Sequence, residues 1–234
     1  MMASLPMSTI VPSSHSCYRI SSRRFNTRRK SDHYKVVNGQ GAIYSEGRYN
    51  SVGVVTVYLT DTIEACIAEK MYYFLRDMVR ALDQSNLPGR ALPPFSHHLT
   101  LWDIQFQNPI DNVFDLEHNY SKFSVMPSMM TNPTQDYTHL KEKRGEIQGQ
   151  RYEGLVAPSS RSVSAGKLVV LFNDLTRNTT SIDPFDVELR LLNVTGGQFA
   201  NQFVETLDFG AGEVRISGHP SGLYSSWTKI DFNH

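Results

Sequence analysis

The sequence is poor in cysteine and has no long hydrophobic run. Its two cysteines, Cys17 and Cys66, are far apart and outside any CxxC or Cys/His spacing, so they indicate neither a disulfide framework nor a structural zinc site. The apolar runs are only a few residues long, as at 168–172, whereas a membrane-spanning helix needs about twenty residues. We therefore expect a soluble protein of a reducing compartment, the cytoplasm, with no membrane partner.

An excess of charge of either sign is also missing. Lys plus Arg and Asp plus Glu each number 23 among 234 residues, so nothing global attracts the chain to nucleic acid, and we expect no direct nucleic-acid binding. Any binding of anions must then be local. Hydrophobic residues make up 40% of the chain, which is enough for one domain with a sizeable core and makes a second full domain unlikely on size alone.

Several widespread catalytic motifs are absent as well. The chain has no GxxxxGK[ST], no GxSxG, no HExxH and no GxGxxG that opens a helix, which disfavours the nucleotide and hydrolase chemistry of those motifs. The neighbouring His97 and His98 lack a third ligand at a useful spacing. We predict a surface or packing role for these histidines and no metal site.

The patterning predicts three consecutive parts of one domain. Residues 1–16 are expected to be disordered, since prolines interrupt any helix there, and residues 17–174 to form the main folded part. Within it, residues 84–135 are rich in Pro and Asn and lack periodicity, which is typical of an insertion or lid. Residues 175–234 are expected to form a strand-rich extension of the same domain.

A strand and a helix are predicted after a Gly-rich loop at 39–50. The β-branched run 52–60 reads as a buried strand, and Asp61 is placed to cap a helix with Glu64 three residues on. Apolar residues at spacings of three and four continue that helix to about Leu82. Glu69 falls opposite this apolar stripe, so we expect it outside the core, either solvated or presented to a cleft.

The later part of the chain adds strands and one more helix. Residues 137–150 are compatible with a helix, and the runs 167–172, 187–194 and 213–217 predict strands. The regular alternation of strand and helix that a doubly wound fold requires is missing. We therefore predict an α+β fold with a mixed or antiparallel sheet and flanking helices.

Four blocks in this order resemble those of the RES-domain family, whose members are typically toxins of bacterial toxin-antitoxin pairs. The blocks are YRI (18–20), GQGAIYSEGRYN (39–50), VVTVYLT with EACIAEK (54–70), and YEGLVAPSSR with KLVVLF (152–172). The order of the blocks is more specific than any one of them. The resemblance covers about residues 17–174 and implies that they form the catalytic domain. The chain departs from the family pattern at Glu46, where a glycine is usual, and at Tyr49, where a tryptophan is usual. A glutamate at 46 would partly neutralise the neighbouring Arg48 and weaken the binding of phosphate.

The resemblance also implies site residues by their motif positions. Arg48 resembles the arginine of the Gly-rich loop, Glu69 the glutamate of the first helix and Ser159 the serine of the Pro-Ser turn. We expect neither Arg48 nor Glu69 in the core. The full set is Arg19, Arg48, Glu69 and Ser159 for catalysis and Tyr58, Arg19, Arg48 and Asn173 for ligand binding.

The resemblance further implies an ADP-ribosyltransferase-like fold and cleavage of the bond between nicotinamide and ribose in NAD+. A carboxylate such as Glu69 would stabilise the cationic ribose, and Arg19 and Arg48 would bind diphosphate or inorganic phosphate. Tyr58 would stack on nicotinamide. No cofactor beyond the substrate is implied. A cognate antitoxin is the expected partner, and a homodimer stays open. Two alternatives to the enzyme acting on NAD+ also stay open: a protein ADP-ribosyltransferase, and an inactive nucleotide-binding or protein-interaction module whose cleft is blocked by Glu46 and the long insertion.

Overall fold

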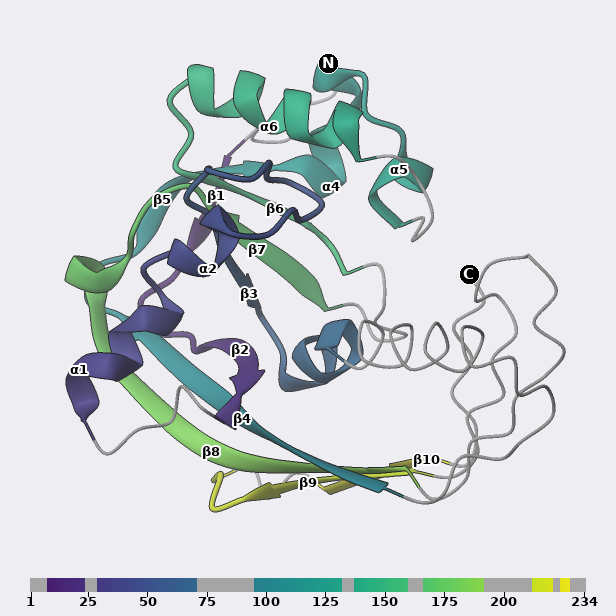
Figure 1. Ribbon diagram of the computed structural model, residues 1–234. Helices are drawn as coiled ribbons and strands as arrows, with labels where there is room; N and C mark the ends of the chain where they lie inside the picture. Colours follow the sequence, from purple (N-terminus) through teal and green to yellow (C-terminus); the bar gives the residue numbers. More distant parts are fainter. Residues whose placement is uncertain are drawn as a thin grey trace, which may run out of the picture.

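A ten-stranded mixed sheet forms the centre of the molecule in a computed structural model (Figure 1). The structure describes residues 8–23, 29–70, 95–131, 137–159, 166–191, 212–220 and 224–227. The strand order is β1-β5-β6-β7-β3-β2-β4-β8-β9-β10. The strands are β1 (Ser8–Val11), β2 (Cys17–Ser22), β3 (Val57–Thr60), β4 (Phe95–Phe106), β5 (Ile110–Asp115), β6 (Gly154–Pro158), β7 (Lys167–Leu171), β8 (Thr179–Leu191), β9 (Gly212–Ser217) and β10 (Tyr224–Trp227).

Short helices flank this sheet. They are α1 (Lys30–His33), α2 (Gln40–Ile43), α4 (Leu116–Asn119), α5 (Pro127–Thr131), α6 (Thr138–Gly149) and the helical residues 63–70, with 3-10 turns η2 (Tyr34–Val36), η3 (Tyr120–Phe123) and η4 (Thr176–Asn178). All strand pairs are antiparallel except β5 with β6. The predicted α+β class is confirmed. Among the described residues no helix has the length and apolar character of a membrane span.

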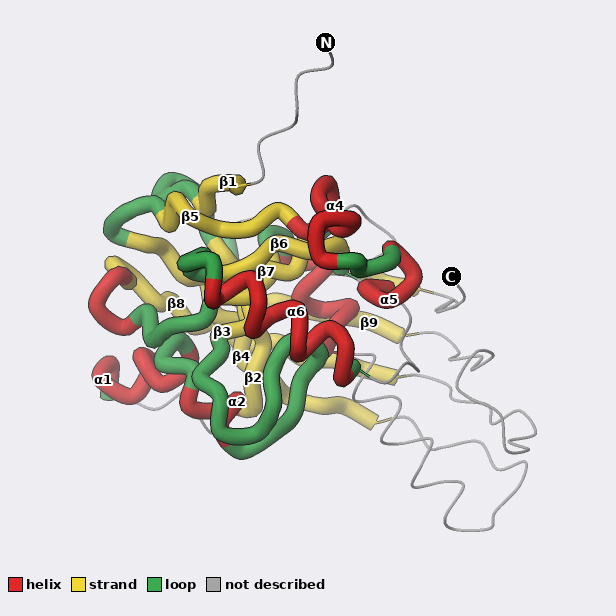
Figure 2. The backbone as a smooth tube through the Cα atoms, turned by 90° about the horizontal axis from the view of Figure 1, so that it is seen from above, coloured by secondary structure: helices red, strands yellow, loops and turns green. Residues whose placement is uncertain are grey.

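The sheet carries a core on each face. On β7, Val169 and Leu171 belong to one buried cluster, and Leu168 and Val170 belong to the other, because successive side chains point to opposite faces of a strand. Helix α6 covers the face of Leu168 and Val170 and contributes residues such as Leu140 to it. Figure 2 shows α6 lying across β6 and β7, next to the loop that follows α2.

The sheet opens between β2 and β3. These two strands pair only through Tyr18 and Thr60, whereas β2 pairs with β4 over six residues and β3 pairs with β7 over four. Beyond the Tyr18–Thr60 pair, the two strands diverge and leave backbone edges that no ladder occupies. Such a split positions residues of β2 and β3 around a concave space.

Where the structure describes it, the segment 84–135 forms strands of the sheet rather than a separate lid. β4 lies between β2 and β8 in the sheet, and β5 lies between β1 and β6. The middle of β4 is buried on both faces, since Leu101 and Trp102 are neighbours in sequence and both fully buried. A central strand of this kind shows no alternation of polar and apolar residues.

The N-terminal region and the first helix also differ from expectation. β1 lies within the segment predicted to be disordered and pairs with β5, with Val11 in the core. β3 begins at Val57 and is shorter than the predicted strand, because Gly53 turns the chain with a φ of 88°. Thr62 caps the helix through the amide of Ala65, at 3.2 Å, one residue later than predicted. Its predicted extension to Leu82 lies outside the described residues.

The remaining predictions agree more closely. Helix α6 and strands β7 and β9 lie where the sequence placed them. β8 covers the predicted strand at 187–194 up to Leu191 and begins much earlier, at Thr179. His97 is half-buried and His98 is exposed on β4, and both pair with β8 through the backbone.

Candidate functional site

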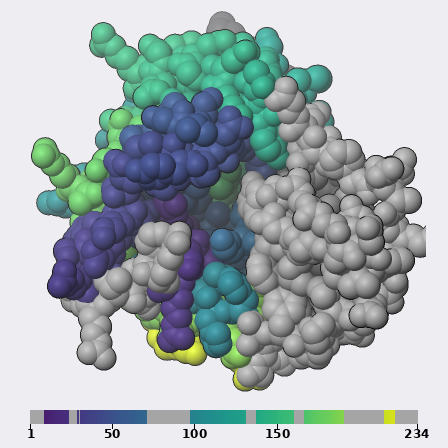
Figure 3. Space-filling view, viewed as in Figure 1, coloured from purple at the N-terminus to yellow at the C-terminus, as the bar shows by residue number. Residues whose placement is uncertain are grey.

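A pocket of about 470 Å³ occupies the split between β2 and β3. Four of the predicted residues line it, namely Arg19, Arg48, Tyr58 and Glu69. They come from β2, the Gly-rich loop, β3 and the helix at 63–70. In Figure 3 the surface is hollowed beneath the dark-blue segment that carries α2 and the Gly-rich loop, with the purple of β2 in its depth.

Glu69 is held by the turn that follows β6. The Ser159 hydroxyl donates a hydrogen bond to Oε1 of Glu69 at 2.9 Å. Ser159 is itself buried, and Glu69 is half-buried on the pocket wall. A hydroxyl donor to a carboxylate fixes the direction in which that carboxylate faces the pocket. The structure thus brings together two residues that are 90 positions apart in the sequence.

The Gly-rich loop is organised around the side chain of Asn50, which is 1% exposed. Its amide nitrogen donates to the carbonyls of Ala42, Ser45 and Ser51 at distances of 3.0, 2.9 and 3.2 Å. These bonds satisfy loop carbonyls that no sheet or helix would pair. Asn50 therefore determines the conformation of the loop that carries Arg48.

Tyr58 fastens the same loop to β3. Its hydroxyl donates to Oδ1 of Asn50 at 2.8 Å and accepts a bond from the amide of Tyr49 at 2.9 Å. Gly47 leaves room for this arrangement, because a Cβ there would lie 2.5 Å from Asn50 Oδ1 and 2.6 Å from the Tyr58 hydroxyl. The Tyr58 hydroxyl is thus committed to the loop, while the residue still lines the pocket.

Arg48 is more buried than the sequence predicted. It is 3% exposed, so the expectation that it lies outside the core is wrong. Its guanidinium lies over the ring of Tyr137, 5.7 Å from the ring centre, just before α6. Burial raises the pKa of the neighbouring Tyr49 phenol to about 12, while Arg48 lowers that pKa and Glu69 raises it. Both charges therefore act on the buried Tyr49 phenol.

Arg19 approaches the pocket from β2. Its Nη1 donates to the carbonyl of Val36 in η2, which orients the guanidinium. Burial lowers the pKa of Arg19, and the nearby Cys66 acts in the opposite direction. A guanidinium that has lost water in this way favours a ligand that supplies negative charge.

Glu46 lines the pocket too, and the sequence raised the question of whether it neutralises Arg48. Its Oε2 lies 3.1 Å from Nζ of Lys141 on α6. The carboxylate therefore has a lysine partner on the helix.

Asn173 is not brought to this site. It is exposed in the bend after β7, and it is not among the residues lining the pocket. β3 runs antiparallel to β7, with Val57 opposite Leu171 and Thr60 opposite Leu168. Asn173 comes just after β7, whose last residue lies beside the start of β3. Glu69 comes after the end of β3, so the two residues lie at opposite ends of this strand pair.

Sequence reasoning missed Cys66 and Lys70, which also line the pocket. Burial raises the pKa of the Cys66 thiol to about 12, so it is a neutral group in the wall. Helical phase was the available signal for Cys66, because it lies three residues before Glu69 on the same helix. Lys70 follows Glu69 directly, so helical phase gave no signal for it. Lys70 adds a third cation to the lining beside Arg19 and Arg48.

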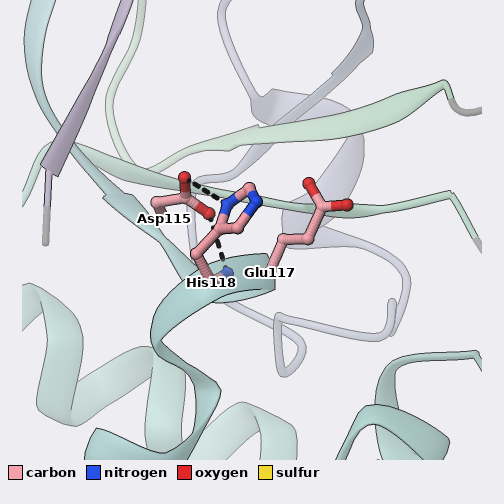
Figure 4. A group of neighbouring side chains, drawn as sticks. All are labelled: Asp115, Glu117 and His118. Carbon is pink, nitrogen blue, oxygen red and sulfur yellow. Dashed lines mark hydrogen bonds and ion pairs between the residues drawn. The ribbon is translucent and has the colours of Figure 1, made fainter. Parts of the chain in front are cut away.

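A separate polar cluster lies where β5 leads into α4 (Figure 4). The side-chain ligand atoms of Asp115, Glu117 and His118 lie within 4.8 Å of one another. Among the described residues, this is the group whose spacing could hold a metal ion. Asp115 caps α4 through the amide of His118 at 3.1 Å and also contacts its ring at 2.9 Å. Glu117 pairs with Nζ of Lys167 at 3.0 Å. These contacts join α4 to β7 and explain the cluster structurally.

Comparisons with known proteins agree with this description. The family model described as the RES domain matches residues 16–191. No curated protein matches the sequence significantly. One similar solved structure is the crystal structure of the M. tuberculosis MbcT-MbcA toxin-antitoxin complex. The match has a TM-score of 0.50 and 15% sequence identity, and it covers 73% of this chain and 83% of that chain. This likeness concerns the fold, and the predicted ADP-ribosyltransferase-like fold is confirmed.

Proposed function

Since this chain belongs to the RES domain family, we propose that it is the toxin of a toxin-antitoxin pair and that it cleaves the nicotinamide-ribose bond of NAD+. The observation that carries the proposal is the carboxylate of Glu69, oriented by Ser159 and facing the same pocket as Arg19 and Arg48. The acceptor of the ADP-ribosyl group is inorganic phosphate or water.

Glu69 suits the first half of this reaction. When the bond between C1 of the ribose and the nicotinamide nitrogen breaks, its electron pair leaves with nicotinamide and positive charge develops on the ribose. A fixed carboxylate beside the ribose stabilises that charge in the transition state. Attack by phosphate then gives ADP-ribose phosphate, and attack by water gives ADP-ribose and a proton.

The cations of the pocket suit the rest of the substrate. Arg19 and Arg48 present planar guanidinium groups from separate elements, and such groups bind phosphate oxygens in pairs. Tyr58 adds an aromatic side chain to the wall for the flat nicotinamide or adenine ring. Nicotinamide is a good leaving group, so positioning and electrostatics supply most of the acceleration.

A cognate antitoxin is the proposed partner. The similar solved structure is that of a toxin bound to its antitoxin, which supports this part of the proposal. It predicts that expression of this chain alone stops bacterial growth and that co-expression of its antitoxin restores growth.

The direct test incubates the purified protein with NAD+, with and without phosphate, and follows free nicotinamide. Glu69→Gln removes the charge while keeping the size of the side chain, and we expect it to lower kcat about 100-fold or more with an unchanged fold. Glu64→Gln is the matched control, because Glu64 is an exposed glutamate of the same helix outside the pocket lining. Folded wild-type protein that releases no nicotinamide in either buffer contradicts the proposal.

The alternatives separate in the same assay. A protein ADP-ribosyltransferase releases nicotinamide only with an acceptor protein present. An inactive module binds NAD+ without turnover. The sequence had two grounds for an inactive module, a blocking insertion and an uncompensated Glu46. The described part of 84–135 belongs to the sheet and Glu46 pairs with Lys141, which favours the enzyme.

A further inference from the structure

We propose that Lys141, which lies outside the pocket lining, is a determinant of anion binding because it neutralises Glu46 at the pocket. The inference deepens the proposed function, on which its NAD+ readout rests, but it concerns the binding of anions in general. Lys141 acts through Glu46 and is therefore a positioning and charge-compensating residue.

Glu46 places a negative charge where an anionic ligand would enter. It lines the pocket in the same loop as Arg48, and its side chain is 62% exposed. Glu69 already contributes one carboxylate to this pocket, and Arg19, Arg48 and Lys70 contribute the cations. A second, uncompensated carboxylate beside them would repel a diphosphate and compete with it for the guanidinium groups.

Lys141 is placed to cancel this charge. Its Nζ lies 3.1 Å from Oε2 of Glu46, and its side chain is 17% exposed. Helix α6 is anchored beside the loop independently of this pair, because the buried Arg144 donates to the carbonyl of Val55 at 3.3 Å and lies over the ring of Phe172 at 4.4 Å. The lysine therefore reaches the carboxylate from a fixed element, at a low entropic cost.

The test measures the affinity for inorganic pyrophosphate by calorimetry at low salt. It compares the wild type with Lys141→Met, Glu46→Gln and the double variant. Lys141→Met should weaken binding about three- to fivefold, since exposed ion pairs of this kind contribute up to about 1 kcal/mol. Glu46→Gln in the same chain should restore it. The KM for NAD+ should rise by the same factor with kcat unchanged, and high salt should remove the difference.

Lys143→Met is the matched control. Lys143 lies on the same helix with its side chain 19% exposed and pairs with Glu146 at 2.7 Å, a residue of α6 itself. This change should leave pyrophosphate binding as it is in the wild type. A merely structural role of Lys141 predicts that Glu46→Gln fails to rescue, which would overturn the inference.

The outcomes for the inference and for the proposed function are distinguishable. Weakened pyrophosphate binding that Glu46→Gln restores supports the inference even if the wild type does not cleave NAD+. Unchanged affinity in Lys141→Met overturns it even if NAD+ is cleaved. A wild type that binds no pyrophosphate also overturns it, because the pocket is then not an anion site.

Discussion

The hydroxyl of Ser159 donates to the carboxylate of Glu69 over 2.9 Å and thereby joins the turn after β6 to the helix at 63–70. Ser159 is buried and the bond itself is partly buried, and it selects one orientation of a side chain that otherwise has several rotamers. The two residues meet at the wall of the pocket that Arg19 and Arg48 also line. The bond therefore makes the position of the carboxylate independent of the ligand.

Ser159→Ala should lower kcat for nicotinamide release about tenfold while changing KM little, because the carboxylate keeps its charge but loses its fixed orientation. Steady-state kinetics measure this. Ser21→Ala is the control, since the Ser21 hydroxyl accepts a hydrogen bond from Trp102 at 2.7 Å and is not part of the lining. It should cost stability and leave kcat unchanged. Equal kcat values for Ser159→Ala and the wild type would contradict the assigned role.

The sequence predicted residues that meet at the pocket better than it predicted the strands of the sheet. Glu69 could be placed opposite the apolar stripe of its helix from the 3.6-residue period alone, and the motif order indicated Arg19, Arg48, Tyr58 and Ser159. β4 could not be predicted in this way. Its buried residues include the adjacent Leu101 and Trp102, because the middle of β4 lies between two strands and is covered on both faces.

Contacts between distant segments account for the rest of what was missed. The pairing of Glu46 with Lys141 and the burial of Arg48 both depend on where α6 packs. No local pattern encodes a contact across 95 residues, so the sequence suggested instead that Glu46 would weaken phosphate binding. Asn173 shows the converse. It follows a correctly predicted strand, but it lies at the other end of that strand from Glu69.

Tyr58→Phe should loosen the Gly-rich loop. The change leaves the Asn50 carbonyl and the Tyr49 amide without the hydroxyl they now share, which should lower the free energy of unfolding by about 1 to 3 kcal/mol. KM should rise as well, because Arg48 lies in this loop. Urea unfolding and kinetics measure the two effects. Tyr44→Phe, in the same loop but 83% exposed, should do neither. If the two variants behave alike, the hydroxyl does not hold the loop.

Gly41→Leu should fill the pocket without unfolding the protein. Gly41 lies in α2 and lines the pocket, and a Cβ there would make an ordinary contact with Arg19 Nη2 at 3.8 Å. Alanine should therefore be tolerated, whereas leucine should raise KM about tenfold or more. Gly145→Leu is the control, since a Cβ at this position of α6 meets nothing within 4 Å. Normal kinetics in Gly41→Leu would show that the substrate binds elsewhere.

Cys66→Ala should make the protein less sensitive to alkaline pH. Burial raises the pKa of this thiol from 9.0 to about 12, so above pH 9 the unfolded chain loses a proton that the folded chain keeps. Unfolding is then favoured as pH rises, and the stabilisation present below pH 9 is lost progressively up to about pH 12, by at most about 1.4 kcal/mol per pH unit. Urea unfolding between pH 8 and pH 11 should give a shallower decline for Cys66→Ala than for the wild type. The small cavity left by the sulfur lowers stability equally at every pH, so the slope separates the two effects.

Cys17 provides a second case. Burial also raises the pKa of its thiol to about 12, so Cys17→Ala should change the slope in the same way. Parallel curves for the wild type and both variants would mean that these thiols do not titrate differently on unfolding.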